Sequence, residues 1–430
     1  MKFVSVVGMG KLGLPLTLMF KLNGFSVIGC DVDFDKIKKL KNGTFLNQEP
    51  QVQDLLNKLN SSILFTTDEK EIIEKSDITF IVVPTPSKKD GSFSSEHVNK
   101  VINKICFYLK KKKQKHTIVV TSTLSPGTME LIKKRIEKQT NKKVGKEIGL
   151  CYSPELIALG SVIKNLTNPD FLFIGESDKE SGDLVESIRK KICLNKPKII
   201  RTNWINAELI KLSLNAYITT KISFANMIAR MAENIKDADS EIILNAIGQD
   251  SRIGTKYLQG GLGFGGPCFP RDNRSLYSTI KNIGLKIDLP LKIDSFNKKQ
   301  IDFVYKLVIK LYKKNQKIGI LGLSYKPNTD VTEESQGILL AQKIIENKIP
   351  LIAFDPQVKE VKDKKIILMN SMEECITDSD VLIIATQWDK FKEIDWNKYN
   401  HKIIIDCWGI VDVTSCKNST NRFVKLGKYI

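Results

Sequence analysis

The residues that decide the fold are Phe3-Val4-Ser5-Val6-Val7-Gly8-Met9-Gly10-Lys11-Leu12-Gly13. A strand leads into a G-x-G-x-x-G turn, a helix-like stretch follows over residues 14–22, and a second strand ends on Asp31. This order predicts a dinucleotide-binding unit, in which Gly8, Gly10 and Gly13 let a pyrophosphate rest on the helix N-terminus. The alternative is a glycine turn that only packs a helix against a strand.

Asp31 indicates which dinucleotide binds. A carboxylate at the end of the second strand can accept hydrogen bonds from the adenosine ribose hydroxyls, but it would repel a 2′-phosphate. NAD is therefore the expected cofactor, rather than NADP.

A polar side chain follows the end of each of three further predicted strands. The apolar strands that end near residues 83, 120 and 152 are followed by Thr85, Thr123 and Glu155, respectively. Ligands bind at the carboxyl ends of strands in an open parallel sheet, so we expect the threonines to face the cofactor and Glu155 to open onto the site. The alternative for the threonines is capping, because Ser or Thr before Pro-Gly often starts a helix.

Residues 207–233 have the apolar periodicity of one long helix, which we interpret as the spine between two halves of the chain. Lys211 and Asn215 lie four residues apart and so share one face of that helix. By spacing alone, two ordinary surface side chains are the commoner explanation of such a pair.

The segment 260–272 has five glycines among its first seven residues and continues to Cys268 and Asp272. Without side chains, main-chain N–H groups can approach a ligand closely, and the segment makes a poor core element. We interpret it as part of an active site. The alternative is a flexible loop with an inert cysteine.

The pattern starts again at Lys317. Segments 317–326, 351–355, 379–386 and 401–406 repeat, in the same order, four segments of the N-terminal half. This repetition predicts a second Rossmann-like domain. Its turn lacks the G-x-G-x-x-G pattern, so it should not bind a second dinucleotide in the same way. Lys326 is instead a candidate for binding a substrate phosphate.

The predicted fold is therefore α/β, with two Rossmann-like domains that contain parallel sheets and are joined by a long central helix. We place an NAD-binding domain at residues 1–203, a central helical domain with the cysteine loop at 204–314, and the second Rossmann-like domain at 315–430.

The composition limits the kinds of protein this chain can be. A length of 430 residues with 42% hydrophobic residues predicts two or three globular domains. No apolar run is long enough to cross a bilayer and the N-terminus is a short strand, so we expect a cytoplasmic protein without membrane insertion. The formal charge of +19 comes mostly from lysines spread along the chain, so we expect no nucleic-acid partner.

The eight cysteines are scattered without a C-x-x-C pair, and there are only three histidines. This distribution favours neither a metal site nor a disulfide framework. The scarcity of histidine also weakens a Ser/His/Asp triad as an explanation.

Together these motifs resemble those of nucleotide-sugar dehydrogenases of the UDP-glucose/GDP-mannose dehydrogenase type, over nearly the whole chain. The cysteine loop is the most specific of them. The segments that carry the resemblance are 8–13, 83–86 with 90–91, 122–128, 153–155, 211–224, 250–254, 260–272 and 325–330.

The resemblance implies an activity and a nucleophile. The family oxidises the C6 alcohol of a nucleotide-linked sugar to the acid, with two NAD and no release of the aldehyde. Cys268 would add to the aldehyde, because a thiohemiacetal can expel hydride, and water would hydrolyse the thioester that results. The implied substrate is a UDP-sugar, with UDP-glucose as the first candidate.

The same resemblance implies roles for other residues. Lys211 and Asn215 would hold the C6 oxygen as it gains negative charge, and Asp272 would order or activate water. Glu155 would act as the base for thioester hydrolysis, with Thr123 assisting through a bound water. The further binding residues are Lys36 for the cofactor and Gly265, Lys326 and Arg252 for the substrate. Arg252 would reach across from the neighbouring subunit of a homodimer.

Three positions depart from the family pattern in zones that contact the sugar or the nucleotide. Leu159 stands where glucose-type members usually have a second Glu, while Trp408 and Glu333 stand where an Arg is usual. A UDP-N-acetylhexosamine and GDP-mannose are therefore alternative substrates. The residues also leave open a single-step dehydrogenase of the 6-phosphogluconate type and, from a different class, a non-catalytic Rossmann protein that binds nucleic acid.

Overall fold

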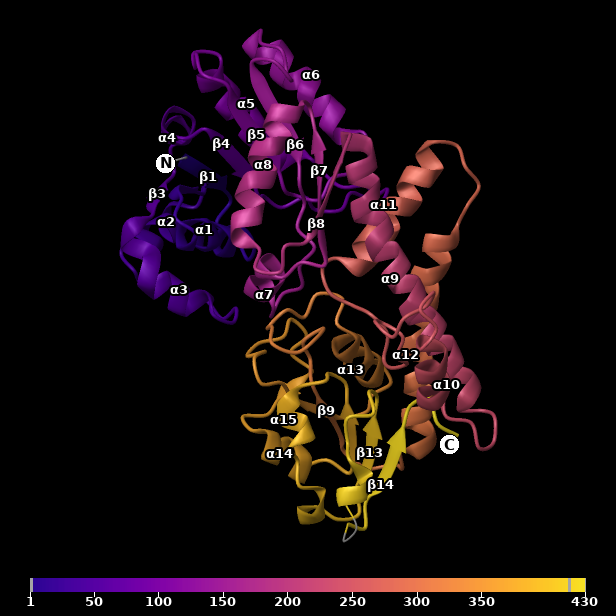
Figure 1. The fold of residues 1–430 in the computed structure, drawn as a ribbon. Helices are drawn as coiled ribbons and strands as arrows, with labels where there is room; N and C mark the ends of the chain where they lie inside the picture. The colour runs from indigo at the N-terminus through magenta and orange to yellow at the C-terminus, as the bar shows by residue number, and fades with distance from the viewer. Residues whose placement is uncertain (1–2, 417–418, 430) are drawn as a thin grey trace. The chain divides into compact units, whose positions relative to one another are not determined.

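The computed structural model describes residues 3–416 and 419–429, and the chain divides into two compact units (Figure 1). One unit comprises Met1–Ser213 and Ser278–Gly284, and the other comprises Leu214–Tyr277 and Leu285–Ile430. Each unit contains one open sheet with helices around it.

The sheet of the first unit has eight strands. They are β1 (Phe3–Val7), β2 (Ser26–Cys30), β3 (Leu64–Thr66), β4 (Ile78–Ile81), β5 (His116–Val120), β6 (Ile148–Tyr152), β7 (Phe171–Glu176) and β8 (Lys198–Thr202). Their spatial order is β3-β2-β1-β4-β5-β6-β7-β8. All neighbours are parallel except β6 and β7. The first six positions have the strand order of a dinucleotide-binding Rossmann sheet.

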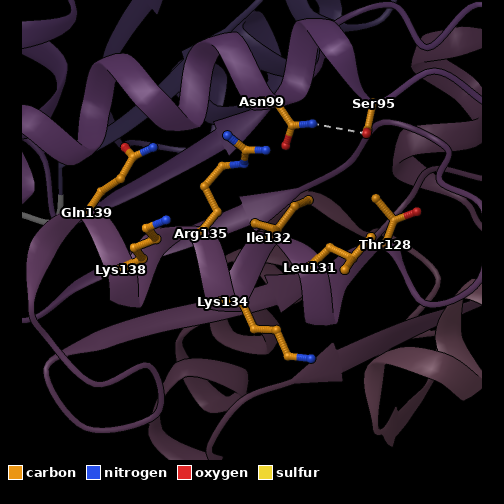
Figure 2. Close-up of a pocket in the computed structure, with 9 residues that line it drawn as sticks. All are labelled: Ser95, Asn99, Thr128, Leu131, Ile132, Lys134, Arg135, Lys138 and Gln139. Carbon is orange, nitrogen blue, oxygen red and sulfur yellow. Dashed lines mark hydrogen bonds between the residues drawn. The ribbon is translucent and has the colours of Figure 1, made fainter.

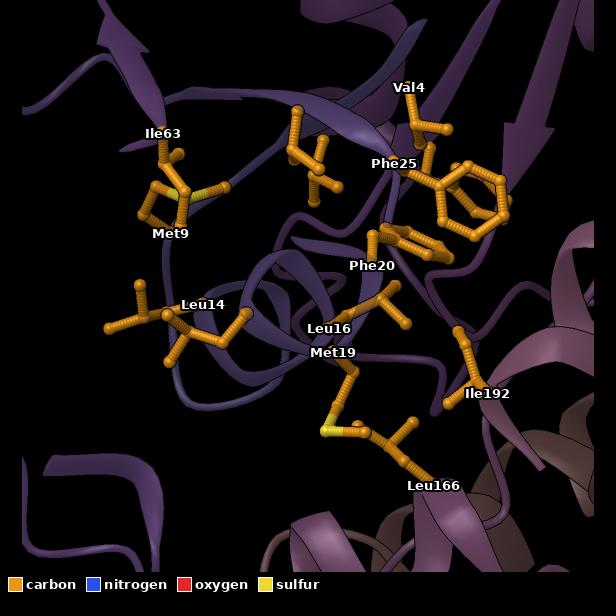
Figure 3. Packing of buried hydrophobic residues seen from close by; sticks show 14 of the residues in the cluster. Val4, Met9, Leu14, Leu16, Met19, Phe20, Phe25, Ile63, Leu166 and Ile192 are labelled. Atoms are coloured by element: carbon orange, nitrogen blue, oxygen red, sulfur yellow. The ribbon is translucent and has the colours of Figure 1, made fainter. Parts of the chain in front are cut away.

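Eight helices belong to the same part of the chain. They are α1 (Gly13–Leu22), α2 (Phe34–Lys41), α3 (Val52–Leu59), α4 (Glu69–Lys75), α5 (Glu96–Leu109), α6 (Thr128–Thr140), α7 (Val162–Thr167) and α8 (Lys179–Ile192). Side chains alternate across the strands, so Val4 and Val6 pack in one apolar cluster and Val7 packs in another. Figure 3 shows Leu16 and Phe20 of α1 in the cluster that contains Val4.

A 29-residue helix, α9 (Trp204–Ala232), begins in the first unit and ends in the second. The sequence predicted this helix over residues 207–233. After it come α10 (Ser240–Gly248), α11 (Phe269–Asn282) and α12 (Leu289–Leu311). Residues 260–268 of the cysteine loop lie between α10 and α11, and residues 269–272 belong to the start of α11.

The sheet of the second unit repeats the first topology. Its strands are β9 (Ile318–Leu321), β10 (Leu351–Phe354), β11 (Ile367–Leu368), β12 (Val381–Ile384), β13 (Ile403–Asp406) and β14 (Arg422–Lys425). They are all parallel, in the order β11-β10-β9-β12-β13-β14. One face packs against α12 and α13 (Gln336–Glu346), and the other against α14 (Met372–Thr377) and α15 (Asp389–Lys392).

The predicted α/β fold with two Rossmann-like sheets and a long central helix is confirmed. The antiparallel pair β6 and β7 was not predicted. The connection between these strands contains only the short helix α7, and an antiparallel neighbour needs no long crossover.

Within residues 3–416 and 419–429, no helix has both the length and the apolar character of a membrane span.

Candidate active site

The glycine turn after β1 leaves room for a ligand at one position and needs glycine for packing at the others. Gly8, with φ of +101°, donates its N–H to the Cys30 carbonyl at 2.7 Å. A Cβ at Gly13 would lie 1.8 Å from the Gly8 carbonyl oxygen. A Cβ at Gly10 would meet no atom within 4 Å, so the space beside it is open near the start of α1. This space fits the pyrophosphate of a dinucleotide.

Asp31, directly after β2, is buried and already has three donors. Its Oδ2 accepts the Met9 N–H at 2.7 Å and Lys36 Nζ at 3.1 Å. Its Oδ1 accepts the Asp33 N–H at 3.0 Å. An ionised carboxylate offers about four acceptor positions, so Asp31 can still accept a ribose hydroxyl. The structure therefore brings the predicted cofactor residues Asp31 and Lys36 together.

Asp355 occupies the matching position after β10, but backbone N–H groups already bind both oxygens of its carboxylate. Its Oδ2 accepts the N–H groups of Leu323 at 2.8 Å and Ser324 at 3.0 Å. Its Oδ1 accepts those of Gln357 at 2.9 Å and Val358 at 3.0 Å. These bonds use the acceptor positions that a ribose would need.

The loops after β4 and β5 are joined by Ser122. Its hydroxyl accepts the Val83 N–H at 2.9 Å and donates to the Val83 carbonyl at 2.7 Å. Thr85 in the first loop is buried, and Thr123 in the second is partly buried. Both threonines lie at the carboxyl ends of neighbouring strands, at the edge of the sheet where the cofactor is expected.

Glu155 follows β6 and has a partner that the sequence did not indicate. The two carboxylate oxygens are bound by the guanidinium of Arg189 on α8, with an Nη2 to Oε2 distance of 2.7 Å and a second bond from Nη1 to Oε1. The side chains of Glu155 and Arg189 are only 4% and 2% exposed. The main-chain carbonyl of Glu155 accepts a hydrogen bond from Lys211 Nζ at 2.9 Å. Three charged residues therefore form one buried cluster.

Glu208 lies one turn before Lys211 on α9 and binds the start of α6. Its fully buried carboxylate accepts the N–H groups of Gly127 at 2.6 Å and Met129 at 2.8 Å. Burial raises the pKa of Glu208, and these N–H groups offset only part of that effect. The loop that carries Thr123 is thereby tied to the helix that carries Lys211.

Cys268 differs from the other cysteines in its exposure. All eight cysteines lie in the described residues; seven are buried, and Cys268 is exposed. Burial raises the pKa of Cys30, Cys106 and Cys375 to about 12, which keeps their thiols protonated. Cys268 directly precedes α11, and the N-terminus of a helix favours a thiolate.

Asn215 and Asp272 are joined in the second unit. Asn215 Nδ2 donates to Asp272 Oδ2 at 2.6 Å, and both side chains are buried. The Asp272 N–H donates to the Cys268 carbonyl at 2.8 Å, within the first turn of α11. The structure therefore brings three of the predicted catalytic residues together.

The glycines of the cysteine loop have a packing role within the second unit. A Cβ at Gly261 would lie 2.5 Å from the ring of Trp408, and one at Gly265 would lie 2.2 Å from the carbonyl oxygen of Glu334. We expected the glycines only to let the backbone approach a ligand. Contact with the C-terminal domain is a second reason for them, and the sequence could not reveal it.

Three buried amide side chains hold the same loop. Asn297 accepts the Phe264 N–H at 2.9 Å and donates to the Phe264 carbonyl at 2.7 Å. Gln336 donates to that carbonyl at 2.6 Å, and Gln300 donates to the Gly261 carbonyl at 2.6 Å. These contacts fix the backbone that leads to Cys268.

The remaining predicted substrate residues have different surroundings. Arg252 follows α10 with 88% of its side chain exposed, and its Nη2 binds Asp250 Oδ2 at 2.6 Å. Gly265 is buried, and Lys326 is partly buried in the loop after β9.

The structure shows the contacts of the three residues that depart from the family pattern. Leu159, which stands in place of the second Glu of glucose-type members, packs against the apolar cluster of the first unit. Trp408 donates from Nε1 to the Ala385 carbonyl at 2.9 Å. The main-chain carbonyl of Glu333 accepts the Gly266 N–H at 3.0 Å. Two of the departures therefore help to shape the cysteine loop.

A groove of about 550 Å³ lies between α5 and α6, outside the predicted site (Figure 2). Its lining includes Lys134, Arg135 and Lys138, but none of the predicted catalytic or binding residues. Over the described ranges, no group of three or more His, Cys, Asp or Glu side chains is arranged to hold a metal ion.

The predicted residues fall into two groups, one in each unit. The first unit contains the cofactor residues with Glu155 and Lys211, and the second contains Asn215, Cys268 and Asp272. The sequence missed Arg189 and gave no role to Glu208. The only sequence signal for Arg189 and Glu208 is that each is a charged residue in a predicted helix. Many other charged residues of this lysine-rich chain share that signal, so it could not single out these two.

The open glycine turn, the acid after β2 and the Rossmann strand order are those of an NAD-binding domain. The chain also matches three consecutive models of one family. The NAD-binding domain of the UDP-glucose/GDP-mannose dehydrogenase family matches residues 2–193, its central domain matches 205–299, and its UDP-binding domain matches 319–413. The chain belongs to this family.

Individual relatives agree over nearly the full length. GDP-mannose 6-dehydrogenase of Pseudomonas syringae pv. tomato is 31% identical over 429 residues, which cover 95% of this chain and 96% of the relative. UDP-glucose 6-dehydrogenase AglM of Haloferax volcanii is 30% identical over 413 residues, with coverages of 94% and 96%. The structure of a UDP-glucose dehydrogenase from the archaeon Pyrobaculum islandicum has a TM-score of 0.90 and 26% identity, and the match covers 100% of this chain and 98% of that one. The predicted class, an NAD-dependent nucleotide-sugar 6-dehydrogenase, is confirmed.

Proposed function

We propose that this enzyme oxidises the C6 alcohol of a UDP-sugar, with UDP-glucose as the first candidate, to the uronic acid through a thiohemiacetal and a thioester of Cys268. The observation that carries the proposal is the position of Cys268. It is the exposed member of eight cysteines, and it stands directly before α11 beside the Asn215–Asp272 pair.

The covalent scheme balances in atoms and electrons. The alcohol loses a proton and a hydride to give an aldehyde, and the Cys268 thiolate adds to its carbonyl carbon. The addition gives the alkoxide of a thiohemiacetal, which expels the second hydride and leaves a thioester. Water attacks the thioester, the carbon–sulfur bond breaks, and the carboxylate and the thiolate are released with two further protons. Two NAD molecules, bound one after the other at the glycine turn, would each accept one hydride.

The polar residues of the two groups have distinct tasks in this proposal. Lys211 and Asn215 stabilise the negative charge on the C6 oxygen, since an ammonium and an amide are good oxyanion donors. One N–H of the Asn215 amide binds Asp272, and the amide has a second N–H for the substrate. Asp272 orders or activates the water that hydrolyses the thioester. Thr123 supports a bound water near the cofactor.

The cofactor residues are Gly8, Gly10 and Gly13 around the open turn, Asp31 with Lys36 at the ribose, and Thr85 with Thr123 at the strand ends. The open space beside Gly10 and the remaining acceptor capacity of Asp31 support this assignment. The role of Glu155 as the base, which the resemblance implies, stays a prediction. Arg189 binds both oxygens of its carboxylate.

The nucleotide and the sugar are the finer part of the proposal. We assign Lys326 and Gly265 to the substrate within one subunit, and Arg252 to the substrate of a neighbouring subunit. Leu159 removes a carboxylate that glucose-type members usually have, which keeps a UDP-N-acetylhexosamine as the main alternative. GDP-mannose is a second alternative, since a relative of 31% identity bears its name.

A homodimer built on α9 completes the proposal. Tyr217, Phe224 and Met231 recur every seven residues on this helix and are 64%, 43% and 51% exposed. A groove of about 430 Å³ at the Met231 end of this stripe is lined by Met231, Ile235 and Phe303, among others. An apolar stripe of this kind favours a partner helix.

A single assay tests the proposal. The purified enzyme is given NAD with UDP-glucose, a UDP-N-acetylhexosamine or GDP-mannose, and both NADH and the sugar product are quantified. We expect two NADH for each uronic acid and the highest kcat/KM with UDP-glucose. One NADH with a ketone product would instead indicate the single-step chemistry of the 6-phosphogluconate type. A preference for another sugar would replace UDP-glucose but keep the covalent scheme.

A further inference from the structure

Arg189 carries a buried charge that the proposed reaction does not use. It is 1% exposed, and its neighbours Val185, Ile188 and Ile192 on α8 are buried apolar residues. Its Nη1 and Nη2 bond to Glu155, and its buried Nε has no hydrogen-bond partner among the described residues. An uncompensated charge in such surroundings is strongly unfavourable, so the Glu155 carboxylate is the group that offsets it.

This pairing restricts what the Glu155 carboxylate can do. A guanidinium fork that holds both oxygens is the strongest common geometry for a carboxylate and fixes its orientation. Taking a proton from water would weaken the pair and leave Arg189 less well compensated. The geometry therefore suits a carboxylate that is held in place better than one that receives a proton during turnover.

The main chain of the same residue holds Lys211. The Glu155 carbonyl accepts the Lys211 ammonium at 2.9 Å, and Lys211 is itself only 7% exposed. A lysine ammonium sits on a flexible four-carbon stem, so a fixed acceptor is needed to hold its direction. Arg189, Glu155 and Lys211 thus form a chain of contacts from α8 through the loop after β6 to α9.

Resting on the proposed function, in which Lys211 stabilises the C6 oxygen, we propose that Arg189 is a positioning residue that fixes residue 155 and through it aims Lys211. Arg189 then acts, through Lys211, on the steps in which the C6 oxygen gains negative charge, and the first hydride step is one of them. Glu155 serves this arrangement through both its carboxylate and its carbonyl, and the water step belongs to Asp272.

Kinetics of Arg189→Met, Arg189→Lys and Glu155→Gln separate this role from catalysis by Glu155. We expect Arg189→Met to slow the first NADH formation by about tenfold or more, with KM for the nucleotide sugar within about threefold of the wild-type value. Arg189→Lys should recover part of the rate. Neither Arg189→Met nor Glu155→Gln should accumulate a covalent sugar adduct on Cys268 in intact-protein mass spectra. An adduct in Glu155→Gln would make Glu155 the base and overturn the proposal.

A second measurement does not depend on activity. The rate at which an amine-specific acylating reagent labels Lys211 is measured by peptide mass spectrometry, with the exposed Lys179 as the internal control. We expect the labelling rate at Lys211 to rise at least about fivefold in Arg189→Met and to stay unchanged at Lys179. The double variant Glu155→Gln/Arg189→Met removes both charges of the buried pair, so it provides a folded comparison, and its Lys211 labelling should also rise.

An unchanged Lys211 labelling rate in both variants would overturn the anchoring role. If the wild-type enzyme oxidises none of the nucleotide sugars, the proposed function fails. The labelling result still decides whether Arg189 positions Lys211.

Discussion

The amide of Asn215 on α9 donates to the carboxylate of Asp272 on α11 at 2.6 Å, inside the second unit. This contact joins a residue proposed to stabilise the oxyanion to one proposed to act on water. The two roles can be separated by experiment, because they belong to different steps of the reaction.

Asp272→Asn should slow thioester hydrolysis without stopping the hydride steps. The amide keeps the shape of the side chain but cannot take a proton from water, so we expect kcat to fall by about a hundredfold. Rapid-mixing experiments should show a burst of NADH, and intact-protein mass spectrometry should show sugar bound to Cys268. A uniformly slow reaction without a burst would assign Asp272 to an earlier step.

Cys268 should be the cysteine that reacts in the native enzyme. Iodoacetamide should alkylate it alone among the eight, because the others are buried. Cys268→Ala should reduce acid formation by at least about a thousandfold and leave NAD binding intact. Peptide mapping and NAD titration provide the two measurements. A near-wild-type rate would return Cys268 to the role of an inert loop residue.

Asp31→Asn should weaken NAD binding, because the ribose loses a charged acceptor. We expect the Kd for NAD to rise by about tenfold, measured by calorimetric titration. Asp355→Asn is the matched control. Asp355 has the same place in the second sheet, but both oxygens of its carboxylate accept hydrogen bonds from backbone N–H groups of the neighbouring loops. That variant should lower the unfolding midpoint and leave the Kd for NAD unchanged. Equal losses of affinity in both variants would contradict the assignment.

Met231→Glu should convert the proposed dimer into a monomer. Met231 belongs to the exposed apolar stripe of α9, and two carboxylates brought together in an apolar interface are unfavourable. Light scattering after size exclusion measures the mass, and Leu46→Glu, at a position that is 84% exposed in the other unit, is the control. A wild-type enzyme of monomeric mass would rule out the dimer.

The sequence predicted the elements whose residues show local patterns. The G-x-G-x-x-G turn and the acid at the end of β2 identified the first sheet, and the repeated landmarks identified the second. The antiparallel direction of β7 escaped prediction, because a strand has the same alternation whichever way it runs.

The parts of the site that escaped prediction depend on contacts between distant residues. Glu155 and Arg189 are separated by 34 positions in the sequence, and Glu208 and Gly127 are separated by 81 positions. Nothing local distinguishes these charged residues from the many exposed ones. Gly261 likewise owes its identity to Trp408, which follows far along the chain.

Glu208 should make the stability of the enzyme depend on pH in a particular direction. Burial raises the pKa of Glu208 above its usual value of 4.5, so the native state binds this proton more tightly than the unfolded chain does. The stability that Glu208 contributes is therefore complete below pH 4.5 and is lost as the pH rises through the raised pKa. Glu208→Gln has no such titration. The difference in unfolding free energy between the wild type and this variant should shrink as the pH rises.

Urea unfolding of both proteins at several pH values between about 4.5 and 7 measures this difference. Glu346→Gln, an exposed position on α13, is the control and should give a difference that does not vary with pH. Glu208→Gln should also loosen the loop that carries Thr123, because an amide can accept only one of the two N–H groups at the start of α6 without turning its own N–H towards the other. Faster amide exchange at Gly127 and Met129 should accompany the loss. A difference that grows with pH would mean that the backbone N–H groups, rather than burial, dominate the titration of Glu208.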